Sequence, residues 1–379
     1  MIWTFLFLFL IVSVVAGVIY LACRIRKFRL LQRIAGGNNK FAAGIGFALT
    51  AAVFGVFWFT LGSMNAIIIL LHLLLFWLIC DGVSALIRKA RSVEFRRYYA
   101  GTMAILLTTV YLSASCYAAY HIWETDYRLT TDKAAGNLRV ALVSDSHVGT
   151  TFDGDGFRIQ MQKIQAKNPD VVLFAGDFVD DDTSKEDMLK ACKALGDLKT
   201  PYGVYYVFGN HDKGYYDNAG RGYDGEDLKA ELAANGVSVL EDETKLIDDR
   251  IYIIGRQDRS EEMERGGSRA SMTELVQGLD KDKYMIVMDH QPCDYNNQAA
   301  SGVDLVVSGH THGGQLFPLR QLGEWFHLGG NDWVYGLTER GNTKFIITSG
   351  ISDWALIFKT DCKSEFAVID IKGAVGASA

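Results

Sequence analysis

The candidate metal-binding and catalytic side chains of this sequence are histidines and carboxylates that directly follow short apolar runs. His310 and His312 are one residue apart; they follow the apolar run Val303–Ser308 and precede two glycines. This pattern is typical of a buried strand that ends in a tight loop. Two imidazoles so placed can face one metal ion, so we expect a metal site at this loop.

Four further segments have the same layout, an apolar run that leads straight into His, Asp or Asn. Their polar residues are Asp145, His147, Asp177, Asn210, His211 and His290. Seven histidines follow Ala100, and five of them lie in these motifs, which chance placement does not explain. In open α/β sheets, ligands bind beyond the carboxyl ends of the strands. We therefore expect five strand ends to point at one site.

The donor types indicate which metals the site would hold. Mixed imidazole and carboxylate ligands suit divalent Mn, Fe, Zn or Co, whereas oxygen ligands alone suit Mg or Ca. With His211 set aside, seven candidates remain, too many for one ion: Asp145, His147, Asp177, Asn210, His290, His310 and His312. Two ions that share a carboxylate fit this number, and ions about 3.5–4 Å apart are used for displacement at phosphorus.

Together the motifs D-x-H, G-D, G-N-H-[DE], H and G-H-x-H resemble, in order and spacing, those of the calcineurin-like metallophosphoesterase superfamily. The longer segment Gly309–Gln315, with Phe317-Pro318 after it, is similar to the membrane-associated bacterial branch with the GHTHGGQ motif. The resemblance covers Leu138 to Ile371. Neither GxSxG nor a P-loop motif occurs, so a serine hydrolase and a P-loop nucleotidase are not supported.

The resemblance implies a role for each motif residue. One metal would be held by Asp145, His147, Asp177 and His312, and the second by Asp177, Asn210, His290 and His310. Asp177 would then be the bridge. His211 would protonate the leaving oxygen or stabilise the developing charge. Asp180 would orient His211; the alternatives to Asp180 are Asp181, Asp182 and Asp212, and segment 180–182 could also be only a solvated loop.

The implied activity is hydrolysis of a phosphodiester or phosphomonoester by a metal-bridging hydroxide, and we favour a diester. The cofactors would be two divalent ions, with Mn first and Fe, Zn or Co as alternatives. An alternative enzyme is a pyrophosphatase of a sugar-nucleotide lipid precursor. An alternative of another class is a non-catalytic membrane scaffold or receptor, but no ligand is missing from the motifs.

The elements that must position these residues alternate between strand and helix, which predicts an α/β fold with two sheets packed as a sandwich and flanked by helices. Expected strands are Leu138–Ser144, Val171–Ala175, Val204–Phe208, Val237–Leu240, Ile251–Ile254, Met285–Met288, Leu305–Ser308, Phe345–Thr348 and Phe366–Ile371, with a hairpin through Lys245–Ile247. Expected helices are Phe157–Lys167, Lys185–Leu198, Gly225–Asn235, Ser271–Leu279 and one around Asp294–Ala300.

Residues 1–100, which precede these elements, differ from the rest of the chain in composition. Residues 1–100 hold 11 Lys and Arg and 2 acidic residues, whereas the rest holds 27 of the 38 basic and 42 of the 44 acidic residues. Apolar runs of about 20 residues are long enough to span a bilayer as helices. We expect four such spans: Ile2–Cys23, Phe41–Leu61, Ala66–Ile87 and Ala100–Ala119. The first run, read as a signal peptide instead, would lack a charged start and a small-residue cleavage site.

Basic residues lie in two loops, 24–40 and 88–97, which we expect to be cytoplasmic. The fourth span then delivers the catalytic part to the extracytoplasmic side of the cell membrane. The expected layout is a membrane domain at 1–123, a polar linker at 124–137 and a catalytic domain at 138–379. Its partners would be the lipid bilayer and a phosphoester substrate, for which a lipid- or envelope-linked compound is one option. The excess of acidic residues after residue 100 argues against binding of nucleic acid.

Overall fold

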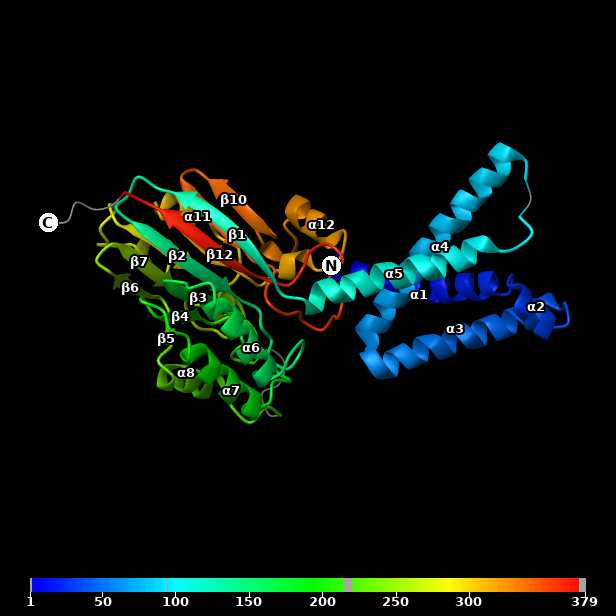
Figure 1. Cartoon of the computed structure of the whole chain (residues 1–379), viewed down its shortest axis with the longest axis horizontal. Coiled ribbons are helices and arrows are strands. Elements are labelled where there is room, and N and C mark those ends of the chain that lie inside the picture. Colours follow the sequence, from blue (N-terminus) through cyan, green and yellow to red (C-terminus); the bar gives the residue numbers. More distant parts are fainter. Residues whose placement is uncertain (1, 94, 215–219, 375–379) are drawn as a thin grey trace. The chain divides into compact units, whose positions relative to one another are not determined.

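The computed structural model of the protein describes residues 2–93, 95–214 and 220–374, and within them all side chains except those of residues 2–7 and 9. The chain divides into two compact units, Met1–Tyr117 and Ala118–Ala379 (Figure 1). The first unit is helical. Every strand of the described chain lies in the second unit.

The helices of the first unit are α1 (Ile2–Ile25), α2 (Arg29–Ile34), α3 (Asn39–Leu61), α4 (Ser63–Arg91) and α5 (Tyr99–Tyr120), whose last residues belong to the second unit. Asn38 caps α3, because its side-chain oxygen accepts hydrogen bonds from the amides of Lys40 and Phe41. Gly62, with a φ of 84°, makes the tight turn between α3 and α4.

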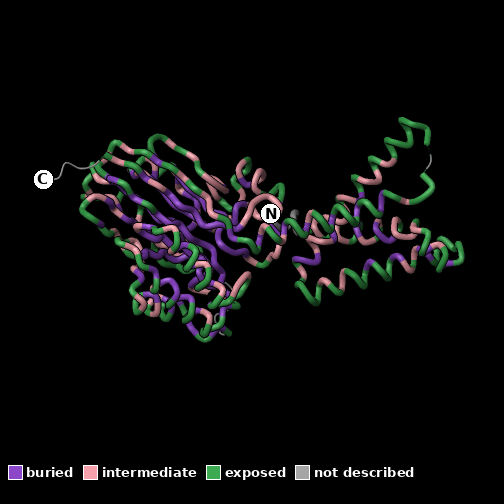
Figure 2. Tube along the Cα trace, viewed as in Figure 1, coloured by how far each residue is buried: buried purple, intermediate pink, exposed green. Residues whose placement is uncertain are grey.

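Three helices, α3, α4 and α5, are long and apolar enough to cross a membrane, at the positions of three expected spans. The expected span Ile2–Cys23 includes side chains outside the described set, and the described apolar part of α1, Leu10–Ile25, is shorter. Figure 2 shows that these helices are largely exposed or half-buried, and Phe59 is 90% exposed. Apolar surface of this extent is stable in lipid and costly in water.

Two six-stranded sheets form the second unit. Sheet A has the order β1 (Trp123–Thr130), β12 (Glu365–Lys372), β2 (Asn137–Val143), β3 (Val171–Ala175), β4 (Val204–Val207) and β5 (Ser238–Val239). Sheet B has the order β10 (Gly336–Arg340), β11 (Thr343–Ile347), β9 (Leu305–Ser308), β8 (Tyr284–Met288), β7 (Ile251–Gly255) and β6 (Glu243–Ile247). Strands β2 to β5 run parallel, and so do β7, β8, β9 and β11.

The sheets pack face to face, and helices cover their outer faces. Leu142 and Leu173 of sheet A share one buried cluster with Ile286 and Val307 of sheet B. The other face of sheet A is covered by α6 (Gly154–Gln165), α7 (Lys185–Gly196) and α8 (Gly225–Ala234), which lie together in Figure 1. The other face of sheet B is covered by α10 (Met272–Leu275) and α11 (Tyr295–Ala300). The α/β sandwich predicted from the sequence is confirmed.

Helix α6 shows how local sequence sets these layers. The Asp153 side chain accepts a hydrogen bond from the amide of Gly156 at 2.7 Å and so caps the helix. Phe157, Met161 and Ile164 recur at helical spacing and are all buried in the cluster against sheet A. The central strands are apolar at every position because both of their faces are covered.

The segment 124–137, which we expected to be a linker, contains most of β1. This strand pairs in parallel with β12 from Trp123↔Glu365 to Thr130↔Lys372. Its sequence is polar because it lies at the edge of sheet A, where much of it faces water. The segment 316–342, for which we expected no strand, contains α12 (Leu319–Phe326), the 3-10 turn η2 (Leu328–Gly330) and β10. A short helix, α9 (Arg259–Met263), follows β7.

Candidate metal centre

The loops that follow five parallel strands meet at one edge of the sandwich. They leave β2, β3 and β4 in sheet A and β8 and β9 in sheet B. These loops bring together every site residue predicted from the sequence: Asp145, His147, Asp177, Asp180, Asn210, His211, His290, His310 and His312. Asp180 and His310 are half-buried, and the other seven are buried.

Side chains that can bind a metal form two groups here. Asp145, His147 and His312 make one group, and Asp177, His290 and His310 make the other; within each group the ligand atoms lie within 4.8 Å of one another. The two histidines of the HxH loop therefore face different groups. The residues of each group are ones that the family resemblance assigned to the same ion, and that assignment stays a prediction.

Asp177 lies between the two groups. Its Oδ2 is 3.1 Å from His290 Nε2 and 3.7 Å from His147 Nε2. The same oxygen thus faces one imidazole of each group, which is the position that a bridging carboxylate needs. Its other oxygen, Oδ1, accepts a hydrogen bond from the amide of His211 at 2.9 Å.

Asn210 completes the second group. Its Oδ1 lies 2.9 Å from His310 Nδ1 and 3.2 Å from His290 Nε2. The Nδ1 of His290 is 2.7 Å from the carbonyl oxygen of Ala175. A carbonyl only accepts, so Nδ1 donates this hydrogen bond and Nε2 is directed into the site, as the outer partner of a metal-binding histidine does.

His211 is oriented by Asp180. The Nδ1 of His211 is 3.0 Å from Asp180 Oδ1, and the other oxygen of Asp180 is 3.3 Å from His147 Nδ1. These three residues form a third group of potential ligands. The His211 ring also packs 5.5 Å from the ring of Trp354. Asp180, the first of the four aspartates considered from the sequence, is thus in contact with this imidazole.

The backbone of the site is strained at the predicted ligands. Asp145, His147, Asp177, His310 and His312 have φ values between 35° and 70°, in the left-handed region that non-glycine residues rarely adopt. Each such residue costs of order 1–3 kcal/mol and persists only where its surroundings hold it. The strain turns the side chains out of the strand direction and into the site, and strain of this kind gathers at functional sites.

Glycines beside the ligands leave room for this close approach. A Cβ atom on Gly209 would lie 2.2 Å from Asp177 Oδ1 and 2.4 Å from its amide nitrogen. A Cβ atom on Gly309 would lie 2.3 Å from both Asp145 Oδ2 and Ser144 Oγ. The glycines of the G-N-H and G-H-x-H motifs are therefore required by packing against the carboxylates.

Asp212 is a functional residue whose role the sequence did not reveal. It is fully buried, and its carboxylate accepts hydrogen bonds from the amides of Asp177, Phe178, Val179 and Gly209 at 2.7–3.1 Å. It faces the backbone of two ligand loops and not His211. Its place in the G-N-H-D motif was the available signal, but only the fold shows which amides it meets.

A second tie holds the HxH loop from the other side. Gln315 Nε2 donates to Asp353 Oδ1 at 3.1 Å, and Lys359 Nζ lies 3.3 Å from the same oxygen. Lys359 is 1% exposed and also donates to the carbonyl oxygens of Ser349 and Ser352. The last residue of the GHTHGGQ motif therefore locks its loop to the segment after β11, a contact that spacing alone does not predict.

Electrostatic coupling in the site follows the geometry. Burial raises the pKa of Asp177, but His290 and His211 outweigh burial and hold that pKa well below its usual value. Burial likewise opposes charge on His290, yet Asp177 raises the pKa of His290 well above its usual value. Burial and the charge of His290 together lower the pKa of His310 to about 4. For His211, Asp177 and Asp180 outweigh burial and raise the pKa to about 9.

The residues fit a metal centre by an independent criterion. His147 is fully buried, and its Nε2 has no hydrogen-bond partner within the described part of the protein; the same holds for the buried His312 Nδ1. Buried polar groups are rarely left unpaired, because each costs about 1–3 kcal/mol. A divalent ion held by imidazole nitrogen and carboxylate oxygen would use the Nε2 of His147.

Comparison with known proteins agrees with this geometry. The family model of calcineurin-like phosphoesterases matches residues 138–314. An uncharacterized metallophosphoesterase of Aquifex aeolicus is 31% identical over 202 residues, which cover 52% of this chain and 72% of that protein. One of Campylobacter jejuni is 28% identical over 241 residues, which cover 62% of this chain and 60% of that protein.

Similarity also extends into the helical part of the chain. A transmembrane protein with a metallophosphoesterase domain from Danio rerio is 27% identical over 342 residues, which cover 84% of this chain and 74% of that protein. The chain spans about three fifths of the length of its Campylobacter jejuni and Helicobacter pylori relatives.

Proposed function

Because this chain belongs to the calcineurin-like phosphoesterase family, we propose that it is a membrane-anchored hydrolase of phosphoesters that uses two divalent metal ions. The observation that carries the proposal is the position of Asp177, whose Oδ2 faces His290 of one ligand group and His147 of the other. A carboxylate between two sets of ligands is the arrangement that a two-metal phosphoesterase requires.

The two proposed ligand sets extend the two groups of side chains. Asp177 is added to the first group as the bridge, and Asn210 is added to the second. One ion would be held by Asp145, His147, Asp177 and His312, and the other by Asp177, Asn210, His290 and His310. When bound, the two ions would lower the pKa of a water molecule and offset the charge on the phosphoryl oxygens. The nitrogen and oxygen donors suit Mn, Fe, Zn and Co, and we propose Mn first.

The role of His211 in this proposal is to give a proton to the leaving oxygen. Asp177 and Asp180 raise the pKa of His211 to about 9, so the imidazole holds its proton at neutral pH. Asp180 accepts from Nδ1 and thereby directs Nε2 away from itself. An acid placed in this way contributes about 10²–10⁴-fold to the rate of a reaction with a poor leaving group.

We favour a diester substrate with an apolar, lipid- or envelope-linked part. The support is a patch of exposed apolar side chains on α12 and the turn before it: Phe317, Leu319, Trp325 and Phe326, which are 48–70% exposed. This helix lies beside the HxH loop, since a Cβ atom on Gly314 would come within 2.6 Å of Arg320 Cα. An apolar substituent of the substrate would gain free energy by covering this patch.

The proposed anchor is the first unit, with α1, α3, α4 and α5 as four spans and the second unit on the extracytoplasmic side of the cell membrane. The support is that basic residues of both loops, among them Arg24, Arg29 and Arg88, line one cavity, as expected of loops on one side of a membrane. A reporter fused after Ala379 that is active only in the periplasm supports this orientation. Activity only in the cytoplasm contradicts it and would point to a pyrophosphatase of a cytoplasmic lipid precursor.

The decisive experiment compares bis(p-nitrophenyl) phosphate with p-nitrophenyl phosphate as substrates of the detergent-purified protein, with Mn and with a chelator. We expect chelator-sensitive hydrolysis that is faster for the diester, and a loss of about 10²-fold or more in Asp177→Asn. No hydrolysis of either ester by protein in which elemental analysis finds two metal ions would contradict the proposal. So would full activity in Asp177→Asn.

A further inference from the structure

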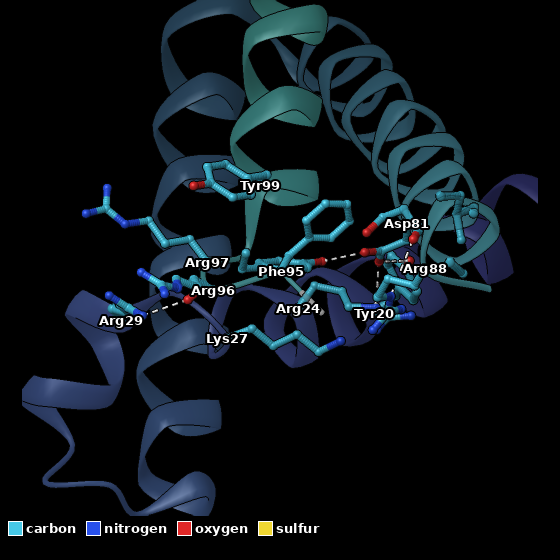
Figure 3. A pocket seen from close by; sticks show the side chains of 15 residues that line it. Tyr20, Arg24, Lys27, Arg29, Asp81, Arg88, Phe95, Arg96, Arg97 and Tyr99 are labelled. Carbon is cyan, nitrogen blue, oxygen red and sulfur yellow. Dashed lines mark hydrogen bonds and ion pairs between the residues drawn. The ribbon is translucent and has the colours of Figure 1, made fainter. Parts of the chain in front are cut away.

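A cavity of about 780 Å³ lies in the first unit and is lined only by residues of that unit. It is formed where α1 ends, where α4 ends and where α5 begins (Figure 3). Six of its lining side chains are basic: Arg24, Lys27, Arg29, Arg88, Arg96 and Arg97. The fold thus draws cations from three separate stretches of the chain into one place.

Among the residues that the structure describes, Asp81 is the single acidic one in the lining, and its carboxylate is already engaged. Its Oδ2 lies 2.9 Å from Arg24 Nε and accepts from the Tyr20 hydroxyl at 2.7 Å, while Oδ1 accepts from the Tyr98 hydroxyl at 2.8 Å. Trp77, fully buried, donates to the Tyr98 hydroxyl at 2.7 Å. This network engages both oxygens of the Asp81 carboxylate, and Arg24 is its ion-pair partner.

Five basic side chains therefore share the cavity without a carboxylate partner among the residues that the structure describes: Lys27, Arg29, Arg88, Arg96 and Arg97. Figure 3 shows Arg29, Arg96 and Arg97 on one side of the cavity and Arg88 on the other, with Lys27 between them. Burial and the charge of Arg24 lower the pKa of Lys27, as expected for an ammonium group crowded by other cations. A cavity lined by charges of one sign attracts ions of the opposite sign.

Apolar surface adjoins the cations. Leu78, Phe95 and Tyr99 also line the cavity, and they are 41–54% exposed. Leu78 and Tyr99 belong to α4 and α5, which are long and apolar enough to cross a membrane. A ligand here would meet guanidinium groups at one end and lipid-facing side chains at the other. That combination suits an amphiphile with an anionic head and an acyl tail.

We propose that this cavity binds the phosphate-bearing headgroup of an anionic phospholipid. Guanidinium groups bind phosphate oxygens with paired hydrogen bonds, and basic residues near a membrane surface attract anionic lipids. A soluble phosphate would have the same head chemistry, but it would leave the apolar rim uncovered. The lipid-binding site is independent of the hydrolytic reaction proposed for the second unit.

The test uses the full chain in nanodiscs of phosphatidylcholine with a minority of phosphatidylglycerol, and native mass spectrometry to count the lipids that stay bound. The test variant is Arg88→Gln/Arg97→Gln. The matched control is Lys89→Gln/Arg91→Gln, which removes two charges from the same loop but does not touch the cavity lining. Lys27→Gln, on another segment, is an independent variant, and size-exclusion chromatography shows that each variant is folded.

We expect the wild type and the control to retain phosphatidylglycerol in preference to phosphatidylcholine, and the test variant to lose about tenfold or more of it. Equal losses in the test and control pairs would overturn the proposal, because diffuse charge would then explain the binding. Retention of neither lipid would also overturn it. A last arm titrates the detergent-solubilised protein with inorganic phosphate; binding that depends on Arg88 and Arg97 without retained lipid would assign the cavity to a soluble ligand.

Discussion

The amide of Asp177 donates a hydrogen bond to the buried carboxylate of Asp212 at 3.0 Å. Asp212 also receives the amide of Gly209, so one side chain fixes two loops that come from neighbouring strands. These loops carry Asp177, the proposed bridge between the two metal ions, and Asn210, a proposed ligand of the second ion. The distance between them is therefore set by a residue that is itself no ligand.

We predict that Asp212→Asn lowers the free energy of unfolding by about 2–3 kcal/mol, because a neutral amide replaces a charged acceptor of several backbone hydrogen bonds. Metal affinity should fall as well, since both loops lose their common anchor. Thermal denaturation and isothermal titration with Mn measure the two effects. Asp182→Asn, an exposed change nearby, is the control, and equal behaviour of the two variants would refute the anchoring role.

In Gly209→Ala, the loop after β4 should no longer fit in close contact with Asp177. The added methyl group would lie 2.2 Å from Asp177 Oδ1, so either the carboxylate or the loop must shift. A displacement of about 1 Å in a catalytic geometry can reduce activity about 10²-fold. Gly220→Ala, where a Cβ atom meets nothing within 4 Å, should leave activity unchanged. Hydrolysis rates at saturating Mn compare the two, and an active Gly209→Ala enzyme would contradict the packing argument.

His211→Asn should have an effect that depends on the leaving group. Esters of alkyl alcohols need a proton on the leaving oxygen, so their hydrolysis should slow by about 10²–10⁴-fold. Esters of p-nitrophenol leave as a stable anion and should be affected far less. The ratio of the two kcat values, with metal content checked by elemental analysis, separates proton donation from a role in metal binding. A uniform loss on both ester types would argue for the latter.

Metal affinity should rise with pH. Asp177 outweighs burial and raises the pKa of His290 well above its usual value, so His290 is protonated at neutral pH when no metal is bound. A metal ion binds only the neutral imidazole and must displace this proton. Between about pH 6 and pH 8, the association constant for Mn should increase about tenfold per pH unit for each proton released. Calorimetry in buffers of different ionisation enthalpy counts the protons; a flat profile would exclude a protonated His290.

Much of the catalytic fold was predictable because its central strands are buried on both faces. Runs such as Val171–Ala175 are apolar at every position and end in Gly, Asp or Asn, so both the strand and its functional end are visible in the sequence. The edge strand β1 was missed for the opposite reason. Its outer residues face water, and its polar composition resembles that of a linker.

Site residues were predictable by type and position in the motifs, but their contacts were not. His310 and His312 were expected to serve different ions from the family resemblance, and the structure places them in different groups. Asp212 and the buried Lys359 hydrogen-bond to backbone groups of other segments. Hydrogen bonds to the backbone carry no sequence signal of their own, because any residue supplies an amide or a carbonyl.

The pairing of β1 with β12 decides where the catalytic unit can be separated from its helices. A soluble fragment that starts at Leu138 would lack β1 and leave the backbone of β12 open along the whole stretch from Glu365 to Lys372. An open edge of this length can recruit the edge of another molecule and promote aggregation. A fragment that starts before Trp123 keeps the edge covered, so the choice of starting residue separates a soluble enzyme from an insoluble one.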